Sequence, residues 1–267
     1  MRDALGLYWW RKLPNFGDAI SQIVVAHAAG RDVCHAKPKV CDLFAVGSIM
    51  NVARNNHLAL REDDTKPWIW GTGCIGNLTG DFLDNVQVAL LRGPMTAKKL
   101  GIEARGFGDP GLLIADAMGE EIARSHKVGL VLHHSHLVDP ALVALADAHR
   151  DIEMIDVRSD PREVCRAIAA CRFVVSSSLH GLVVADSFGV PNRWLDPTGI
   201  HRKPEFKFLD YAAGIGRKLD VPILAEELAG FVAGLGDERI GYQDGIERSK
   251  CDLMTAFPQE LKQERMQ

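Results

Sequence analysis

Residues 174–191, with the sequence VVSSSLHGLVVADSFGVP, run from an apolar strand through three serines directly into a helix. Ser178 stands at the N-cap position, which places His180 in the first turn, where backbone N–H groups lack partners within the helix. These free donors and the positive end of the helix dipole favour a bound anion. Gly189 and Pro191 end the helix. The stretch therefore predicts an α/β fold with a histidine beside an anion site, at the carboxyl end of a strand.

The same stretch also fits a simpler structure. In that alternative, Ser176 to Ser178 only cap a core helix, and His180 packs against a neighbouring element. The stretch taken alone does not separate the two, so other parts of the chain decide between them.

The composition limits the class of protein and its partners. With 267 residues, the chain is long enough for one large α/β domain or two of ordinary size. A hydrophobic content of 47% with 25% charged residues is ordinary for a globular protein with a packed core. The net charge of −4 gives no overall attraction to nucleic acid or to an anionic membrane. An anion site must therefore be local, and no nucleic-acid partner is expected.

The sequence favours a cytoplasmic location. No apolar run has the length of a membrane span, and no signal-peptide core follows residues 1–4. The six cysteines have no CxxC spacing, which indicates reduced thiols rather than a disulfide framework.

Short apolar strands alternate with helical patterns along the chain, as in folds with parallel sheets. A charged stretch at residues 119–127 interrupts this series, and a second, shorter series follows it. We therefore predict two Rossmann-like domains, residues 1–120 and 121–235, that face each other across a cleft. The polar residues 236–267 are expected to pack back across the junction or to be partly flexible. The predicted strands cover residues 5–10, 43–46, 68–70, 86–91, 128–132, 152–156 and 173–175.

Most of these strands end in glycine next to a polar residue. Each such end is compatible with an ordinary turn, but the carboxyl ends of parallel strands meet at one edge of a sheet. Arg92 is the most informative, because its guanidinium suits a bidentate contact with a carboxylate or phosphate. The alternative for Arg92 is an ordinary surface arginine. Asp18, at the end of a loop, is expected to cap the helix that follows it.

Two motifs suggest a cofactor or a metal but lack the residues that such sites need. Residues 71–76 match GxGxxG after a strand, yet a poor helix follows and no acidic residue stands about twenty positions later. On a strand, His134 and His136 would share one face while His133 faces the other way. No cysteine or carboxylate lies at zinc spacing from them. We expect structural or substrate-contacting histidines, no metal and no cofactor.

Six short blocks follow one another in the chain: NFGD at 15–18, WGTG at 70–73, LRGPMT at 91–96, GDPGLL at 108–113, SSSLHGL at 176–182 and KFLDY at 207–211. In these residues and in this order, the chain resembles the polysaccharide pyruvyl transferase family over roughly residues 7–212. The resemblance implies a fold like that of the two-domain GT-B glycosyltransferases, with the active site in the interdomain cleft. It also implies phosphoenolpyruvate as donor, a sugar of a bacterial exopolysaccharide or cell-wall glycan as acceptor, and a pyruvate ketal as product.

The chain departs from that family at two positions. Some members have an arginine where this chain has Ser178. A second cationic contact with the donor is then expected from another residue, and the candidates are Arg202, Lys203 and Lys207. Members often have Pro-His at a strand end where this chain has a leucine before His133.

Ketal formation from phosphoenolpyruvate joins two sugar hydroxyls to C2 of the donor and expels phosphate. The site therefore needs cations for a carboxylate and a phosphate, and an acid and a base with pKa values near the working pH. Arg92 and Lys207 suit the cationic roles, and His180 suits proton transfer or a phosphate contact. Asp18 or Asp210 suits a base or a group that orients Lys207, although each also fits a capping or structural role. The predicted site has His180, Arg92 and Asp18 as catalytic residues and Asn15, Gly17, Lys207, Ser177, Ser178, His133, Asp109 and Asp210 as substrate-binding residues.

Two other functions fit the same sequence. A glycosyltransferase that uses a sugar nucleotide would need a carboxylate for the donor ribose, and Asp186, on the helix body after His180, is the candidate. A binding or scaffolding relative that has lost catalysis fits the arginine missing at Ser178.

The acceptor of a pyruvyl transferase is expected to be a sugar or a lipid-linked oligosaccharide. A lipid-linked acceptor implies peripheral association with the inner face of the cytoplasmic membrane. No amphipathic basic helix is evident in the sequence.

Overall fold

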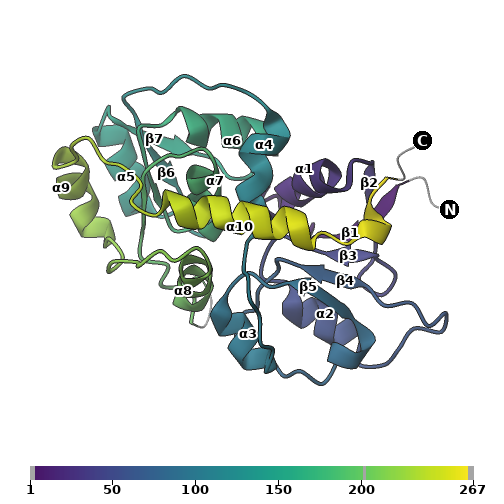
Figure 1. Cartoon of the computed structure of the whole chain (residues 1–267). Coiled ribbons are helices and arrows are strands. Elements are labelled where there is room, and N and C mark those ends of the chain that lie inside the picture. Colours follow the sequence, from purple (N-terminus) through teal and green to yellow (C-terminus); the bar gives the residue numbers. More distant parts are fainter. Residues whose placement is uncertain (1–3, 201–202, 264–267) are drawn as a thin grey trace.

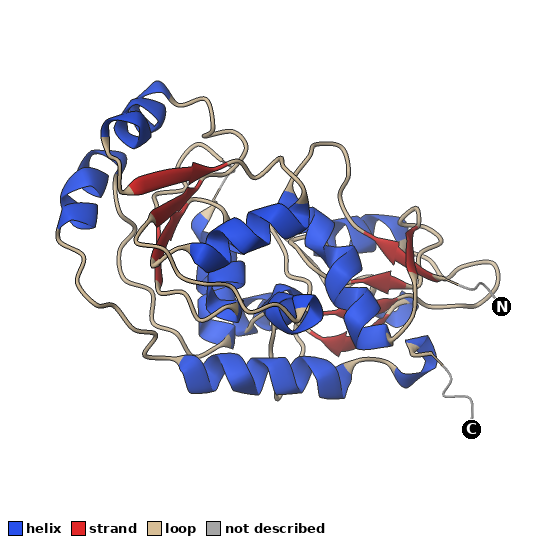
Figure 2. Ribbon diagram, turned by 90° about the horizontal axis from the view of Figure 1, so that it is seen from above, coloured by secondary structure: helices blue, strands red, loops and turns tan. Residues whose placement is uncertain are grey.

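The chain folds into two parallel β-sheets with helices around and between them, as the computed structural model in Figures 1 and 2 shows; it describes residues 4–200 and 203–263. The first sheet has five strands in the order β2-β1-β3-β4-β5, and all neighbouring strands are parallel. This is the flavodoxin-like order, in which the sheet changes its direction of growth between β1 and β3. The strands are β1 Leu5–Tyr8, β2 Val33–His35, β3 Leu43–Phe44, β4 Trp68–Trp70 and β5 Gln87–Leu90.

The second sheet repeats this order over four strands. Its strands are arranged β7-β6-β8-β9 and are again all parallel. The direction of growth changes between β6 and β8, so each sheet has one topological switch point. The strands are β6 Val128–Val131, β7 Ile152–Ile155, β8 Phe173–Ser176 and β9 Asn192–Trp194.

Helices connect the strands and cover the sheets. α1 contacts both α4 and α6, so it lies between elements that precede and follow the charged stretch 119–127. The helices are α1 Phe16–Ala29, α2 Met50–Asn56, α3 Pro94–Leu100, α4 Ile114–Met118, α5 Pro140–Ala148, α6 Pro161–Ala170, α7 Leu179–Ser187, α8 Glu205–Gly214, α9 Leu228–Ala233 and α10 Gln243–Ala256. Short 3₁₀ helices are η1 Leu83–Asn85, η2 Pro110–Leu113, η3 Ala225–Glu227 and η4 Gln259–Leu261.

The central strands β1, β6 and β8 are buried along their whole length. Near-continuous apolar strands are expected where helices cover both faces of a parallel sheet. One apolar cluster extends from Leu5 in the first sheet through Ile20 of α1 and Leu182 of α7 to Trp194 in the second sheet. The two sheets therefore share a continuous core, and the helices α1 and α7 lie within it.

The long helix α10, yellow in Figure 1, passes the second sheet and reaches the first. At its C-terminal end, the indole N–H of Trp70 donates to the carbonyl oxygen of Leu253 at 2.9 Å. Phe257 packs edge-on against Trp70 with 4.9 Å between the ring centroids. Beyond the helix, the N–H of Gln263 donates to the carbonyl oxygen of Ala29 at 2.9 Å. The described residues after 235 are thus anchored on the first sheet and on α1.

The strand pattern of the sequence agrees closely with the structure. All seven predicted strands are present, and their ends differ from the prediction by at most two residues. The sequence does not predict β2 or β9. β2 is short and largely exposed, and β9 has only three residues with two polar ones among them. In the sequence, the strands of the first sheet precede residues 119–127 and those of the second sheet follow them. The domain boundaries at 120 and 235 remain a prediction.

Two local expectations are wrong. Asp18 does not cap α1; the N-cap is Asn15, whose Oδ1 accepts the N–H of Gly17 at 3.1 Å, and Asp18 lies in the first turn. The histidines at 133–136 are not on a strand, because β6 ends at Val131 and a turn follows.

The close approach of α10 to the end of α8 predicts an unusual response to Gly245→Ala. A glycine in a helix ordinarily gains about 0.5–1 kcal/mol of stability when replaced by alanine. At Gly245, however, a Cβ would lie 1.9 Å from the carbonyl oxygen of Ile215. We expect Gly245→Ala to lower the free energy of unfolding by about 1–3 kcal/mol, measured by urea denaturation.

Gly230 provides the matched control for this prediction. It lies inside α9, and a Cβ there would meet no heavy atom within 4 Å. Gly230→Ala should therefore stabilise the protein by about 0.5–1 kcal/mol. Equal gains in both variants would contradict the proposed contact between α10 and α8.

Candidate active site

The predicted site residues gather where the two switch points approach each other. In the first sheet, Ser48 follows β3, and α1 begins just after the loop that follows β1. In the second sheet, His133 follows β6 and Ser177 follows β8. Doubly wound sheets bind their ligands outside the carboxyl ends of the strands at such points. The starts of α1 and α7 meet here, at Gly17 and His180.

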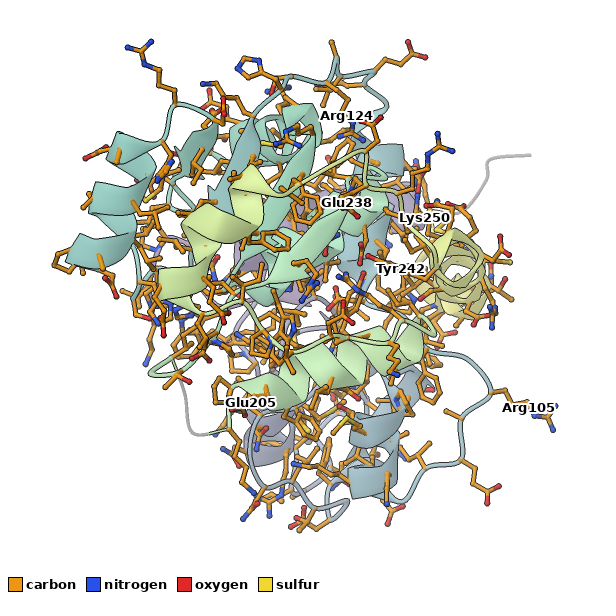
Figure 3. The ribbon with its side chains drawn as sticks, turned by 90° about the vertical axis from the view of Figure 1, so that its left-hand side faces the viewer. Arg105, Arg124, Glu205, Glu238, Tyr242 and Lys250 are labelled. Atoms are coloured by element: carbon orange, nitrogen blue, oxygen red, sulfur yellow. The ribbon has the colours of Figure 1, made fainter. Side chains whose placement is uncertain are left out.

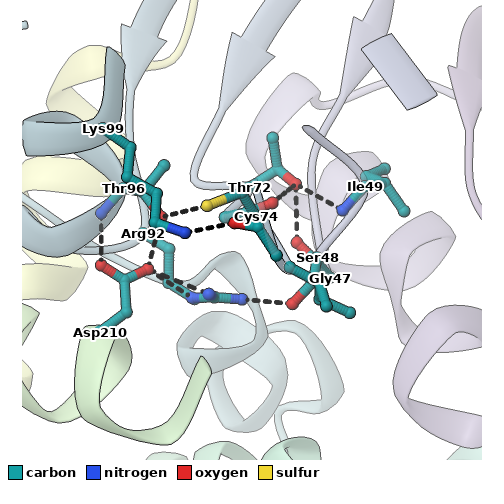
Figure 4. Close-up of polar contacts among 12 residues, drawn as sticks. Gly47, Ser48, Ile49, Thr72, Cys74, Arg92, Thr96, Lys99 and Asp210 are labelled. Atoms are coloured by element: carbon teal, nitrogen blue, oxygen red, sulfur yellow. Dashed lines mark hydrogen bonds and ion pairs between the residues drawn. The ribbon is translucent and has the colours of Figure 1, made fainter. Parts of the chain in front are cut away.

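The fully buried guanidinium of Arg92 joins three parts of the chain (Figure 4). Its Nε donates to Oδ2 of Asp210 on α8 at 3.1 Å, and its Nη1 donates to Oγ of Ser48 at 2.7 Å. Nη2 lies 3.0 Å from the same Asp210 oxygen, but within the described ranges it completes no hydrogen bond. Breaking a buried ion pair typically costs about 3–5 kcal/mol. The pair therefore fixes α8 against the first sheet.

The start of α3 holds the other side of Asp210. Its Oδ1 accepts the N–H of Thr96 at 2.9 Å, and its Oδ2 accepts the Thr96 hydroxyl at 2.7 Å. A Cβ on Gly93 would lie 1.9 Å from the Asp210 carbonyl oxygen, and one on Gly73 would lie 2.2 Å from Cζ of Arg92. Side chains are therefore excluded at both glycines, and both carboxylate oxygens of Asp210 are occupied.

His180 lies in the first turn of α7, as predicted, and packs on the first turn of α1. A Cβ on Gly17 would lie 2.1 Å from Nδ1 of His180. Its Nε2 is buried, and no residue in the described part of the chain makes a hydrogen bond to it. Burial lowers the pKa of His180 to about 3, and the positive charges of Lys207 and Arg92 add to this effect. The imidazole is therefore neutral at neutral pH.

Lys207 places a buried ammonium group in the same region. It lies on α8, which Figure 3 shows beside α3 with its first residue, Glu205, labelled. Its Nζ lies over the Phe208 ring, 5.4 Å from the ring centroid, and no carboxylate in residues 4–200 or 203–263 forms an ion pair with it. Burial lowers the pKa of Lys207 from 10.5 to about 8; the charge of Arg92 adds to this, and Asp18 opposes it. The site thus holds a cation without a paired anion.

Two carboxylates near these cations have raised pKa values. Oδ2 of Asp18 accepts the side-chain N–H of Asn15 at 2.9 Å, and burial raises the pKa of Asp18 to about 6. Asp109 begins η2, where its Oδ1 accepts the N–H of Gly111 at 3.0 Å. Its Oδ2 is buried without a hydrogen-bond partner among the described residues, and burial raises the pKa of Asp109 to about 6. Both groups are largely ionised at neutral pH.

The serines at the end of β8 support turns rather than a helix cap. Oγ of Ser177 accepts the N–H of His133 at 3.0 Å and lies 3.1 Å from Nδ1 of His136. Ser178 is the N-cap residue of α7, as predicted, but its hydroxyl makes no cap hydrogen bond. Its N–H instead donates to Oγ of Ser176 at 3.0 Å. The contact between His133 and Ser177 bridges the switch point of the second sheet.

The structure adds three residues to the predicted set. Ser48 binds Arg92, and Thr96 binds Asp210. Ser48 follows β3 directly after a glycine, and Thr96 lies in the first turn of α3, three residues after a glycine. The ring of His134 lies 4.0 Å from that of His133, and burial together with the charge of Lys207 lowers the pKa of His134. The histidine cluster in the sequence is the signal that points to it.

Of the candidates for the second cation, Lys207 lies among the other site residues. Lys203 borders a small cavity together with Lys207, and Arg202 lies outside the described residues. A larger hollow of about 1200 Å³ is formed mainly by residues 39–66 and contains none of the predicted site residues. In residues 4–200 and 203–263, no group of three or more His, Cys, Asp or Glu side chains could hold a metal ion. No helix in these ranges is long and apolar enough to span a membrane.

Known proteins resemble this chain in sequence. It is 28% identical over 195 residues to the succinoglycan biosynthesis protein ExoV of Rhizobium meliloti (strain 1021), covering 70% of this chain and 59% of ExoV. It is 27% identical over 118 residues to the uncharacterized protein L143 of Acanthamoeba polyphaga mimivirus, covering 43% of this chain and 41% of L143. The matches thus span about half the length of these relatives.

A solved structure of the uncharacterized protein KP1_0663 from Klebsiella pneumoniae superposes with a TM-score of 0.49 and 10% identity, covering 82% of this chain and 93% of that one. A sequence model of the polysaccharide pyruvyl transferase family matches residues 4–198. Because this match covers most of the 267 residues, the chain belongs to the polysaccharide pyruvyl transferase family.

Proposed function

We propose that this chain transfers the pyruvyl group of phosphoenolpyruvate to a sugar of a polysaccharide, forming a pyruvate ketal. The observation that carries the proposal is the nearly buried Lys207, whose ammonium lies over the Phe208 ring and forms no ion pair within the described ranges. It is electrostatically coupled to Arg92 and His180, which each keep one buried nitrogen without a hydrogen bond there. A buried charge without a partner is costly, and a small dianion would supply the partner. Family membership and the name of ExoV, which refers to the biosynthesis of a polysaccharide, support the same conclusion.

The donor contacts follow from the hydrogen-bonding capacity of these groups. A guanidinium has five N–H donors, and Arg92 uses only Nε and Nη1 in hydrogen bonds to described residues, so Nη2 is left for a donor oxygen. Lys207 takes the second anionic group of the donor. The first backbone N–H groups of α7, after Ser178, add further donors. Lys207 thus replaces the arginine that some family members carry at the position of Ser178.

The reaction needs one proton delivered and two removed. The terminal CH₂ of phosphoenolpyruvate takes a proton, and C2 gains oxocarbenium character. One sugar oxygen attacks C2 and loses its proton, the C2–O bond to phosphate breaks, and a second sugar oxygen closes the ketal. One hydroxyl proton replaces the proton given to the CH₂ group, and the other leaves with phosphate.

Asp18 and His180 suit the two proton-transfer roles. Asp18, with a pKa of about 6, is ionised at neutral pH and still basic enough to take a hydroxyl proton. His180 is neutral until an anion binds, because burial lowers its pKa to about 3. A bound phosphate raises this pKa, since an adjacent negative charge favours the imidazolium. His180 then carries the proton that the donor CH₂ group accepts.

The alternative function as a nucleotide-sugar glycosyltransferase lacks a carboxylate for the ribose. Asp186 is fully buried, and its oxygens accept hydrogen bonds from the hydroxyls of Tyr211 and Tyr242, each at 2.8 Å. The amide of Asn192 donates to it at 2.6 Å, and Arg217 lies 3.4 Å away. Asp186 therefore holds α7, α8 and the segment before α10 together, and hydrogen bonds from its own chain already occupy both of its oxygens.

Phosphoenolpyruvate should stabilise the protein against heat, because a ligand that binds only the native state raises the melting temperature. UDP and GDP should leave the melting temperature unchanged, as should a neutral ester of the donor that lacks both charges. The measurement is differential scanning fluorimetry at several ligand concentrations. Stabilisation by UDP or GDP alone would support a glycosyltransferase, and stabilisation by none of them would support a binding or scaffolding relative.

Arg92→Lys should weaken phosphoenolpyruvate binding by about ten- to a hundredfold. Loss of a charge-assisted hydrogen bond typically costs about 1.5–3 kcal/mol, and an ammonium cannot reproduce the planar arrangement of the guanidinium donors. The dissociation constant is measured by isothermal titration calorimetry.

Arg217→Lys is the matched control, because Arg217 is also buried and ion-paired but contacts Asp186 rather than the proposed donor site. Both variants should lose some thermal stability. Equal dissociation constants in the two variants would show that Arg92 only holds the structure together.

The affinity for phosphoenolpyruvate should fall as the pH rises above about 8. The pKa of Lys207 in the free protein is about 8, so the ammonium that binds the anion loses its proton through this range. The phosphate of the donor, with a second pKa of about 6, is already ionised there. Titration calorimetry between about pH 7 and pH 9.5 should show up to a tenfold loss per pH unit beyond the pKa. Lys207→Arg should abolish this loss, because a guanidinium stays protonated; the same loss in Lys207→Arg would place the titrating group elsewhere.

A further inference from the structure

A groove of about 420 Å³ lies on the first sheet beside the proposed donor site. The loop after β1 and the end of β2 form one wall, with Trp9, Trp10 and His35. The first turns of α1 form the other wall, with Asn15, Ala19 and Gln22. None of these residues except Asn15 belongs to the predicted site.

The aromatic wall of the groove has a fixed shape. The ring of His35 stands edge-on to that of Trp9 with 4.7 Å between centroids, and Nε2 of His35 lies 3.2 Å from the Trp9 carbonyl oxygen. Cζ of Arg11 lies over the Trp9 ring, 5.7 Å from its centroid, and Nζ of Lys12 lies over the Trp10 ring, 5.2 Å from its centroid. Lys12 does not line the groove, so the ring surface of Trp10 that is open to a sugar is the part that Lys12 does not cover. Trp10 is half-buried, so part of its indole surface remains accessible at the groove.

The helical wall supplies amides and space. Asn15, Ala19 and Gln22 are spaced so that they share one face of α1. The small side chain of Ala19 leaves room between the two amide groups. An aromatic wall opposite amide groups matches a pyranose, which has an apolar C–H face and a rim of hydroxyls.

The groove leads to the proposed base. Asn15 lines the groove, and its Nδ2 donates to Oδ2 of Asp18 at 2.9 Å. Asp18 in turn lies beside the loop after β3, since a Cβ on Gly47 would lie 3.5 Å from its Oδ1. Along the carboxyl edge of the first sheet, the order is therefore groove, Asp18, and then Arg92 with Ser48.

We propose that this groove binds the acceptor glycan, with Trp10 against the C–H face of a neutral sugar and Asn15 and Gln22 on its hydroxyls. The inference rests on the proposed function, because it assigns the acceptor side of that reaction. A sugar held here presents its hydroxyls to Asp18, and the donor held by Arg92 and Lys207 lies on the other side of Asp18.

The test is titration calorimetry with two neutral probes, the tetrasaccharides cellotetraose and maltotetraose. The wild-type protein should bind at least one probe, and Trp10→Ala should weaken that binding by about tenfold or more. Gln22→Arg gives the second variant. Because Gln22 is exposed on α1, a larger side chain there fills the groove without disturbing the core, and it should also weaken binding.

Trp68→Ala is the matched control. Trp68 begins β4, which β1 and β3 separate from β2 in the same sheet, and it borders the other hollow, so sugar binding should be unchanged. Absence of binding to both probes, or undiminished binding in both Trp10→Ala and Gln22→Arg, would overturn the inference. Stabilisation by phosphoenolpyruvate is measured in the same proteins: if it persists while the groove variants have no effect, the acceptor assignment fails and the proposed function stands. If phosphoenolpyruvate does not stabilise the wild-type protein, the proposed function itself fails.

Discussion

The buried ion pair between Arg92 and Asp210 is the interaction on which the arrangement of the site depends. Neither side chain is exposed to water, so each charge needs the other together with hydrogen bonds from Ser48 and Thr96. The pair fixes α8 against the ends of the first-sheet strands. Lys207 lies three residues before Asp210 on the same helix, so the contact that holds α8 also sets the position of the unpaired ammonium.

Glycines make this close packing possible, and they explain a motif that suggests a nucleotide site. Gly71 has a φ of 77°, and a Cβ there would lie 2.4 Å from Cδ of Pro110. The guanidinium of Arg92 occupies the space that a side chain on Gly73 would fill. The imidazole of His180 does the same at Gly17. In residues 71–76, Gly71 therefore leaves space for Pro110, and Gly73 leaves space for the guanidinium of Arg92. A phosphate-binding turn uses glycines for close approach as well, which is why the sequence pattern alone does not distinguish the two uses.

The sequence predicts the parts of the site that depend on local pattern. Strand ends and the helix start at Ser178 follow from apolar runs and cap residues, so the positions of Arg92 after a strand and of His180 in the first turn of a helix are predictable. The partner of Arg92 is not, because Asp210 lies 118 positions away and the contact depends on the packing of α8. The pKa values are equally inaccessible, since burial in the folded protein is the first cause of each shift in Asp18, His180 and Lys207.

The lowered pKa of Lys207 makes the free site prefer an anionic ligand. In the folded protein this pKa is about 8, against 10.5 in an unfolded chain. Below about pH 8 the ammonium is charged in both states, so the full free-energy cost of burying the charge, here called the penalty, destabilises the folded state. At 1.36 kcal/mol per pKa unit, that penalty is about 3 kcal/mol, and it disappears only above the unfolded pKa. This value already includes the opposing charge of Asp18, which raises the pKa of Lys207. An anionic ligand that restores the pKa of Lys207 converts this cost into binding energy, whereas a neutral ligand does not. The electrostatics of the free site therefore favour an anionic ligand over a neutral one.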